Sequence, residues 1–202
     1  ALSSSAKPAR LSAEQVRCSA QGMQFKVMEQ HDGHTEECEL SCGLVGAFNV
    51  SNLLCVLASL RHWGFSLQQA VGACAALTPV PGRMQWVQPE QGSAHEQPLG
   101  VVDYAHTPDA LSKVLQSLRP LAQARSGRLW CVVGCGGGRD ASKRPLMSAV
   151  AAQQADRIVL TSDNPRGESP EFILSQMLLG LEGHPNVLVE SDRAFAIAYA
   201  MA

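Results

Sequence analysis

The sequence predicts an α/β protein whose second part forms a doubly wound, mostly parallel sheet. After residue 82, short apolar segments alternate four times with segments of helical periodicity, which is typical of βα units. These apolar segments also lack polar–apolar alternation, as expected when helices cover both faces of a sheet. We therefore expect a Rossmann-like domain over residues 83–202, truncated at its end, preceded over residues 1–82 by the C-terminal part of another α/β domain.

Residue patterns place the elements of the first region. Residues 1–10 are rich in Ser, Ala and Pro and indicate a loose connection. Apolar and polar residues alternate over 23–27, and an Asp-Gly pair follows, which predicts a strand and a hairpin turn. Ser66 is the expected N-cap of a helix that ends before Pro79. The expected elements are strands at 23–27 and 35–41 and helices at 46–62 and 66–77.

The second region repeats one unit, a strand followed by a helix. Three of its helices carry Pro at or near the first turn, where the missing N–H costs nothing. We expect strands at 99–102, 129–133, 157–161 and 187–189, and helices that begin near Thr107, Pro145, Ser169 and Asp192.

Composition narrows the class of protein. With 202 residues, 46% of them hydrophobic and a net charge of -2, the chain has a soluble, globular composition without broad attraction to nucleic acid or anionic membranes. No apolar run reaches about 18 residues, so no membrane-spanning helix is expected. The seven cysteines are odd in number and lack zinc-site spacing, which indicates reduced thiols, a cytoplasmic location and no metal site. The chain does not begin with Met and ends inside an apolar run, so we expect a fragment of a longer protein.

The segment Asp163-Asn164-Pro165-Arg166 follows a predicted strand, at the sheet edge where α/β proteins bind ligands. Pro165 makes the turn stiff, and Arg166 offers a planar fork of donors that matches a carboxylate or phosphate. A plain strand-to-helix turn with a solvated Arg is the alternative for this segment alone.

A glycine-rich segment at 134–138 follows the preceding strand and ends at Arg139. Glycines allow close backbone approach and can form an anion-binding nest. The segment is neither a P-loop nor the dinucleotide fingerprint. Arg139, Lys143 and Arg144 favour an anionic ligand, and we expect Arg139 and Arg166 to converge on one negative group.

Three further segments suit a nucleotide. Asp103, Tyr104 and His106 follow a predicted strand at a helix N-terminus and can meet ribose, purine or phosphate, although a capping turn also explains His106. Asn49 and Asn52 share a helix face and can read an adenine edge, with local backbone bonding as the alternative. Arg83 can reach phosphate across a crevice between domains.

Together these motifs resemble the Mur ligase family of peptidoglycan synthesis over about residues 16–202. In chain order they are Gly46-Ala47-Phe48-Asn49-Val50-Ser51-Asn52, Pro81-Gly82-Arg83-Met84, Val102-Asp103-Tyr104-Ala105-His106-Thr107-Pro108-Asp109, Gly134-Cys135-Gly136-Gly137, Lys143-Arg144-Pro145-Leu146-Met147 and Asp163-Asn164-Pro165-Arg166. Gln85 and Gly138 depart from the family's usual Glu and Asp, beside matched positions.

The resemblance implies an ATP-dependent amide ligase of three domains. Within the family, the motifs are most similar to the member that adds meso-diaminopimelate to the D-glutamate of UDP-N-acetylmuramoyl-L-alanyl-D-glutamate. Such ligases convert the glutamate side-chain carboxylate to an acyl phosphate, which the amine attacks. Residues 1–82 would then end the central, P-loop-type ATP-binding domain, and residues 83–202 would bind the amino acid.

The resemblance also assigns residues. Those implied around the nucleotide are Asn49, Arg83, Asp103, Tyr104 and His106, and those implied for meso-diaminopimelate are Arg139, Asp163, Asn164, Pro165 and Arg166. In the family, Arg at position 166 marks diaminopimelate users. The P-loop, Mg²⁺ ligands, carbamylated lysine and UDP-sugar domain are expected before residue 1, and a Gly-Lys-Gly-His-Glu segment after residue 202. We thus expect no catalytic residue in this fragment and no activity from it alone.

Other functions remain open at this point. A lysine-adding or other Mur ligase is one, although Arg166 argues against it. A non-catalytic Rossmann-type module for a nucleotide or metabolite is another. A dinucleotide oxidoreductase is disfavoured because the glycine fingerprint fails.

Overall fold

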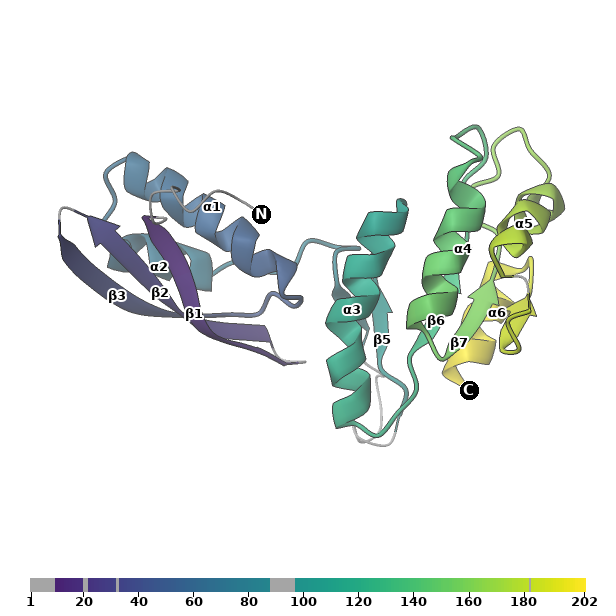
Figure 1. Ribbon diagram of the computed structural model, residues 1–202, viewed down its shortest axis with the longest axis horizontal. Helices are drawn as coiled ribbons and strands as arrows, with labels where there is room; N and C mark the ends of the chain where they lie inside the picture. The colour runs from purple at the N-terminus through teal and green to yellow at the C-terminus, as the bar shows by residue number, and fades with distance from the viewer. Residues whose placement is uncertain (1–9, 20–21, 32, 88–96, 182) are drawn as a thin grey trace, which may run out of the picture. The chain divides into compact units, whose positions relative to one another are not determined.

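A computed structural model of the chain describes residues 10–19, 22–31, 33–87, 97–181 and 183–202. The chain divides into two compact units, Ala1–Met84 and Gln85–Ala202 (Figure 1). The boundary expected between residues 82 and 83 lies close to this division, which falls between Met84 and Gln85. The roles expected for the two regions stay predictions.

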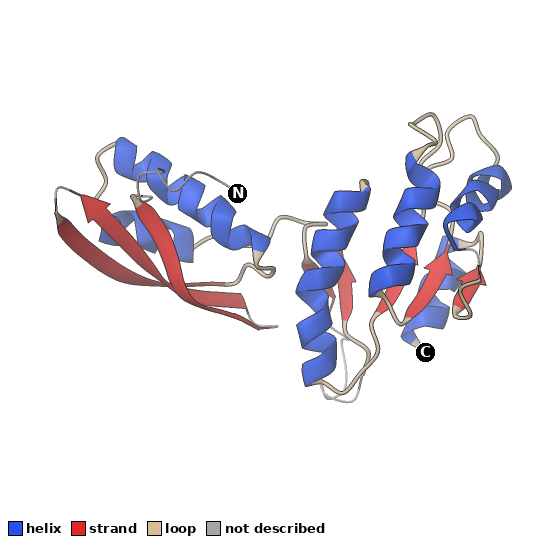
Figure 2. Cartoon of the chain, in the orientation of Figure 1, coloured by secondary structure: helices blue, strands red, loops and turns tan. Residues whose placement is uncertain are grey.

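The first unit packs two helices against one face of an antiparallel sheet (Figure 2). Alternate residues of the middle strand, Met23, Phe25 and Val27, are buried with Leu53 and Leu57 of the first helix. The alternation in the sequence therefore predicted the buried face. The elements are β1 (Leu11–Ser19), β2 (Gly22–His31), β3 (His34–Cys42), α1 (Phe48–His62) and α2 (Leu67–Ala75).

Four expected elements of this unit are confirmed, and one strand was missed. Ser66 caps α2 in a capping box with Gln69, as its position indicated. Strand β1 was not predicted: it is an exposed edge strand with a bulge between Glu14 and Arg17, so it shows no clean alternation. The loose connection expected at 1–10 and the turn residue Asp32 lie outside the described residues, except Arg10.

The second unit alternates strands and helices, as predicted. Strands β6, β7 and β8 form a parallel sheet in that order. Thr107, Ser169 and Asp192 each accept a hydrogen bond from the first turn of the helix that follows. The elements are β4 (Gln85–Val87), β5 (Gly100–Val102), α3 (Pro108–Ala124), β6 (Trp130–Val133), α4 (Lys143–Gln154), β7 (Arg157–Leu160), α5 (Pro170–Leu178), a 3₁₀ turn at Leu179–Leu181, β8 (Val187–Val189) and α6 (Arg193–Met201).

One pairing differs from the expectation of a single run of parallel strands. Strand β5 pairs antiparallel with β4, which was not predicted. Strand β4 has only three residues and follows directly on a Pro-Gly turn, so it is too short for a period to show. Within the described residues the parallel pairs are β6 with β7 and β7 with β8.

The parallel sheet positions the loops that matter for function. Helix α4 lies in front of it and α6 behind (Figure 1), and Ile158, Val159 and Leu160 of β7 are all buried. Val133 pairs with Leu160 at the ends of β6 and β7. The loops after these two strands therefore start side by side at the carboxyl edge.

No helix in the described ranges combines the length and apolarity needed to cross a bilayer. All seven cysteines are free thiols.

Candidate functional site

The loops that follow β6 and β7 lie against each other. The Gly137 N–H donates to the Asn164 carbonyl at 2.9 Å. Only glycine allows this approach, since a Cβ on Gly137 would lie 1.8 Å from the Pro165 carbonyl oxygen, and one on Gly134 would lie 2.4 Å from the Thr161 carbonyl oxygen. The glycines interpreted from the sequence as room for an anion are here packed against the neighbouring loop.

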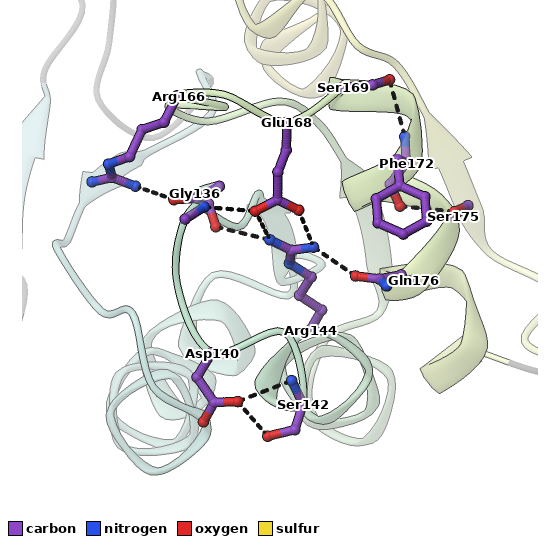
Figure 3. Close-up of polar contacts among 12 residues, drawn as sticks. Gly136, Asp140, Ser142, Arg144, Arg166, Glu168, Ser169, Phe172, Ser175 and Gln176 are labelled. Atoms are coloured by element: carbon purple, nitrogen blue, oxygen red, sulfur yellow. Dashed lines mark hydrogen bonds and ion pairs between the residues drawn. The ribbon is translucent and has the colours of Figure 1, made fainter.

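Arg166 lies on the second loop and reaches back to the first (Figure 3). Its Nη1 donates to the Gly137 carbonyl at 2.6 Å, and its backbone N–H donates to Asn164 Oδ1 at 3.3 Å. Its backbone adopts a φ of 52°, which is uncommon outside glycine. A guanidinium has five N–H groups, so the bond to Gly137 orients the fork while other donors remain for a ligand.

The other residues expected to bind the amino acid lie on the same two loops. Asp163 and Asn164 are exposed and Pro165 is partly buried on the second loop, and Arg139 is exposed directly after Gly138 on the first. The structure brings the two loops together. Convergence of the Arg139 and Arg166 guanidinium groups on one anion stays a prediction.

The charge of Arg144 is used inside the protein, contrary to the expectation that it favours an anionic ligand. Arg144 is 1% exposed, and its Nη1 and Nη2 donate to the two carboxylate oxygens of Glu168 at 2.8 and 2.9 Å (Figure 3). Lys143 lies 3.9 Å from Asp140 in an exposed pair. Arg139 is thus the basic residue of this group that faces solvent without such a neighbour among the described residues.

Sequence reasoning missed the partnership of Arg144 and Glu168, although a signal was present. Arg144, Met147, Ser148 and Ala151 are the buried residues of α4, at the spacing of one helical stripe. An arginine on a buried stripe requires an acidic partner. The identity of that partner, 24 positions further along the chain, was not readable from local pattern.

The electrostatics of this edge follow from the same pair. The hydrogen bonds from Arg144, and next the one from the Gly138 N–H, lower the pKa of Glu168 to about 2. Burial raises the pKa of the Cys135 thiol to about 11, against a smaller opposing effect of Arg144. Glu168 is therefore a carboxylate at neutral pH, and Cys135 is a protonated thiol unsuited to nucleophilic attack.

Three of the expected nucleotide residues lie in the loop between β5 and α3. Asp103 Oδ1 accepts from the Ala105 N–H at 2.8 Å, and His106 Nδ1 lies 3.1 Å from the Tyr104 carbonyl. The Tyr104 and His106 rings meet edge to face at 5.7 Å, and Tyr104 is 68% exposed. The loop therefore presents an aromatic surface beside a carboxylate, at the N-terminus of α3.

The remaining two expected residues belong to the first unit. Asn52 Nδ2 donates to Asn49 Oδ1 at 3.0 Å and Asn49 Nδ2 donates to the Val45 carbonyl at 2.8 Å, so the two amides share a face and are also locally bonded. The exposed Arg83 closes a turn in which its N–H donates to the Val80 carbonyl at 2.9 Å. Gly82, with a φ of 72°, supplies the positive angle this turn requires.

Two other features of the described residues carry no assignment. A hollow of about 420 Å³ opens between β1 and α1, but Arg10 and Arg61 in its wall are both paired with the buried Glu29. Burial alone would raise the pKa of Glu29, and the bonds from Arg61 and Arg10 outweigh it and lower that pKa. No three His, Cys, Asp or Glu side chains in the described ranges are grouped to hold a metal ion.

Comparison with known proteins gives one family and a consistent set of relatives. Residues 82–202 match the family model described as Mur ligase, glutamate ligase domain. A relative from Acidovorax sp. (strain JS42), named UDP-N-acetylmuramoyl-L-alanyl-D-glutamate--2,6-diaminopimelate ligase, is 53% identical over 96% of this chain and 37% of its own length. A relative of the same name from Janthinobacterium sp. (strain Marseille) is 47% identical over 94% of this chain and 36% of its own.

Solved structures agree with this placement. A structure of UDP-N-acetylmuramoyl-L-alanyl-D-glutamate--2,6-diaminopimelate ligase is 38% identical, covers 97% of this chain and 38% of that one, and has a TM-score of 0.61. The Mycobacterium tuberculosis folylpolyglutamate synthase complexed with ADP covers 96% of this chain and 40% of its own, with a TM-score of 0.69 at 20% identity, which shows a shared fold. The chain thus spans well under half the length of these relatives.

Proposed function

The chain belongs to the Mur ligase family, and we therefore propose that it is part of an ATP-dependent ligase that adds meso-diaminopimelate to the D-glutamate of UDP-N-acetylmuramoyl-L-alanyl-D-glutamate. The proposal applies to a protein of the relatives' length that contains these residues. Within it, residues 1–82 would end the ATP-binding domain and residues 83–202 would hold the incoming amino acid.

The observation that carries the proposal is the oriented guanidinium of Arg166 at the joined loops. Diaminopimelate is lysine with an added distal carboxylate, and an arginine fork pairs with a carboxylate through two parallel hydrogen bonds. The bond to the Gly137 carbonyl already fixes the fork, which lowers the cost of ordering it on binding. Arg139, Asp163, Asn164 and Pro165 complete the proposed site on the same loops.

Selectivity against lysine is expected because lysine lacks the distal carboxylate that would pair with Arg166. Lysine would leave the fork of Arg166 without its partner, and truncating one member of such a pair costs about 2–5 kcal/mol. At about 1.4 kcal/mol per tenfold, this predicts roughly one to four decades of discrimination. The relatives named above supply independent support, because their names specify 2,6-diaminopimelate.

We propose Asn49 and Arg83 of the first unit, and Asp103, Tyr104 and His106 of the second, as nucleotide-binding residues of the whole protein. The side chains fit ATP chemically: Tyr104 presents an exposed ring, Asp103 can accept from ribose hydroxyls, and an arginine suits phosphate. When bound, ATP supplies the phosphoryl group that activates the glutamate carboxylate. The chain's own loops would hold the amino acid so that its amine forms the new amide bond.

Magnesium is proposed only for the whole protein. The described residues contain no three-residue cluster suited to a metal, so no role in this chain is assigned to it. We further propose a cytoplasmic location and no nucleic-acid or membrane partner, supported by the free thiols and the net charge of -2.

The test is an amide-ligation assay on the full-length protein that contains this chain. Phosphate release and product mass would be followed with the UDP-linked dipeptide, ATP and one of three amine substrates: the amino acids meso-diaminopimelate and L-lysine, or the dipeptide D-alanyl-D-alanine. We expect product with diaminopimelate at a kcat/KM at least about tenfold above that with lysine. Equal use of lysine, or turnover only with D-alanyl-D-alanine, would refute the proposed substrate.

A further inference from the structure

The largest fully buried side chain of the described residues is an arginine, Arg144. It rises from the first turn of α4 and meets Glu168, which lies two residues after Arg166 in the loop that follows β7 (Figure 3). The contact is bidentate, with distances of 2.8 and 2.9 Å, and the Arg144 and Glu168 side chains are 2% and 30% exposed. Such a fork is strongly directional, so it fixes the position of Glu168 relative to α4.

The same two side chains also hold the glycine-rich loop and α5. Glu168 Oε1 accepts the Gly138 N–H at 2.6 Å, and Arg144 Nη2 donates to the Gly136 carbonyl at 3.4 Å. Arg144 Nη1 donates in addition to Gln176 Oε1 of α5 at 2.6 Å. One ion pair therefore connects both loops of the candidate site to helices α4 and α5.

A short chain of contacts links this pair to Arg166. Gly138, held by Glu168, follows Gly137, whose carbonyl accepts from Arg166 Nη1 and whose N–H donates to Asn164. A shift of Gly138 would move the Gly137 carbonyl, and with it the orientation of the Arg166 guanidinium. A misplacement of about 1 Å, caused by a change remote from the reacting atoms, can lower the rate on the order of 100-fold.

We propose that the Arg144–Glu168 pair is a clamp that positions the two amino-acid-binding loops and thereby sets affinity for diaminopimelate without touching it. The inference rests on the proposed function of the site. Positioning explains the pair better than stability does, because burying an ion pair is costly and often adds little to stability. Arg144 Nε is also buried without a hydrogen-bond partner among the described residues, which would be a poor arrangement if stability alone were served.

A matched control exists in the same unit, at the other edge of the sheet. Asp156, just before β7, accepts from Arg119 Nη1 and from the Leu129 N–H, both at 2.7 Å. Like Glu168, it is a loop carboxylate that joins a helix arginine to the backbone of a neighbouring segment. It lies away from the loops at 134–138 and 163–168, so Asp156→Asn removes a comparable pair without touching the clamp.

The first experiment needs no substrate. Hydrogen exchange would be followed by mass spectrometry in the full-length protein, comparing peptides that cover 134–138 with peptides that cover β6. In Glu168→Gln we expect exchange of the glycine loop to accelerate about 10-fold or more relative to β6, because the tie to Arg144 is weakened. In Asp156→Asn this ratio should stay as in the wild type. An unchanged ratio in Glu168→Gln, or equal changes in both variants, would overturn the clamp.

The second experiment separates positioning from stability by kinetics. Glu168→Gln and Arg144→Lys should raise the KM for diaminopimelate about 10- to 100-fold, which is the size of effect seen in metal sites when a residue that orients a ligating side chain is mutated. They should change the KM for ATP less than about twofold. Asp156→Asn should change neither value. Arg144→Lys keeps the positive charge but removes the bidentate contact with Glu168. A wild-type KM for diaminopimelate in Glu168→Gln would refute the inference.

The two proposals fail in different ways. If the wild-type protein forms no product with diaminopimelate, the proposed function is wrong, and the exchange experiment still decides the clamp. If the wild type is active and Glu168→Gln has the same KM for diaminopimelate, the function stands and the clamp is wrong.

Discussion

Arg166 combines an unfavourable backbone with a side chain proposed to bind substrate. Its φ of 52° brings the guanidinium back over the glycine loop, where it contacts the Gly137 carbonyl. Non-glycine residues in this conformation cost about 1 kcal/mol or more, and such strain is found disproportionately at functional sites. The role proposed for the guanidinium thus explains why an arginine, rather than a glycine, occupies a position with this backbone conformation.

This strain predicts a difference between two variants that both lack the guanidinium. Arg166→Gly should be more stable than Arg166→Ala by about 1 kcal/mol, because glycine adopts positive φ without a steric penalty. Urea unfolding of both variants would measure it. Equal stability, or a more stable alanine variant, would mean that the loop relaxes to another backbone conformation.

Gly137 offers a second test of the joined loops. Gly137→Ala places a Cβ 1.8 Å from the Pro165 carbonyl oxygen, whereas Gly167→Ala, in the neighbouring loop, meets nothing within 4 Å. We expect Gly137→Ala to lower the free energy of unfolding by about 1–3 kcal/mol and Gly167→Ala to change it by less than about 0.5 kcal/mol. Similar effects of the two substitutions would show that the loops are not in contact as described.

The lowered pKa of Glu168 gives a pH dependence with a defined direction. The pKa falls from the ordinary 4.5 to about 2 in the folded protein, chiefly through the Arg144 hydrogen bonds. The stabilising effect of the carboxylate is therefore complete above pH 4.5 and is lost as the pH falls from 4.5 toward 2. Unfolding at several pH values should show the wild type losing its advantage over Glu168→Gln across this window. A constant difference between the two proteins would contradict the assignment.

At the residue scale, the sequence predicted which side chains gather at the carboxyl edge but not how they are used. Arg166 was placed on the correct loop from the strand that precedes it. Arg144 was grouped with the anion-binding residues, and it is instead neutralised by Glu168. A pairing between side chains far apart in sequence depends on the register of β6 and β7, which no local pattern encodes.

At the scale of elements, helix starts were the most predictable feature. Thr107, Ser169 and Asp192 were recognised because their oxygens, followed by Pro or a helical pattern, satisfy the first-turn N–H groups. The two missed strands, β1 and β4, lack the features on which prediction depends. The first is a bulged edge and the second has three residues, so tertiary pairing rather than pattern defines them.

The cap of α3 can be tested directly. Thr107 Oγ1 accepts the Ala110 N–H at 3.3 Å. Thr107→Ala should lower the free energy of unfolding by about 1 kcal/mol. Thr107→Ser should retain most of the wild-type free energy of unfolding, because serine keeps the hydroxyl oxygen that accepts the hydrogen bond. Thermal or urea unfolding would measure both. A serine variant as unstable as the alanine variant would assign the effect to the methyl group rather than the cap.

At the scale of the whole molecule, the alternation of strands and helices was sufficient to predict the α/β class of the second unit. Apolar segments without alternation predicted strands covered on both faces, and β7 is buried along its apolar length. The proposed nucleotide residues are divided between the first unit and the second. The sequence motifs identified candidate residues in both units, but a local sequence pattern carries no information on how separate units are arranged.

The account depends most on Arg166 as the group that recognises the distal carboxylate of diaminopimelate. The most direct measurement is the ratio of kcat/KM for diaminopimelate to that for lysine in the full-length protein, for the wild type, Arg166→Ala and Arg128→Ala. Arg128 is an exposed arginine next to β6 at the opposite edge of the sheet, and serves as the control. We predict that Arg166→Ala reduces the ratio by about 10-fold or more, while Arg128→Ala leaves it unchanged. A wild-type ratio in Arg166→Ala would contradict the central claim.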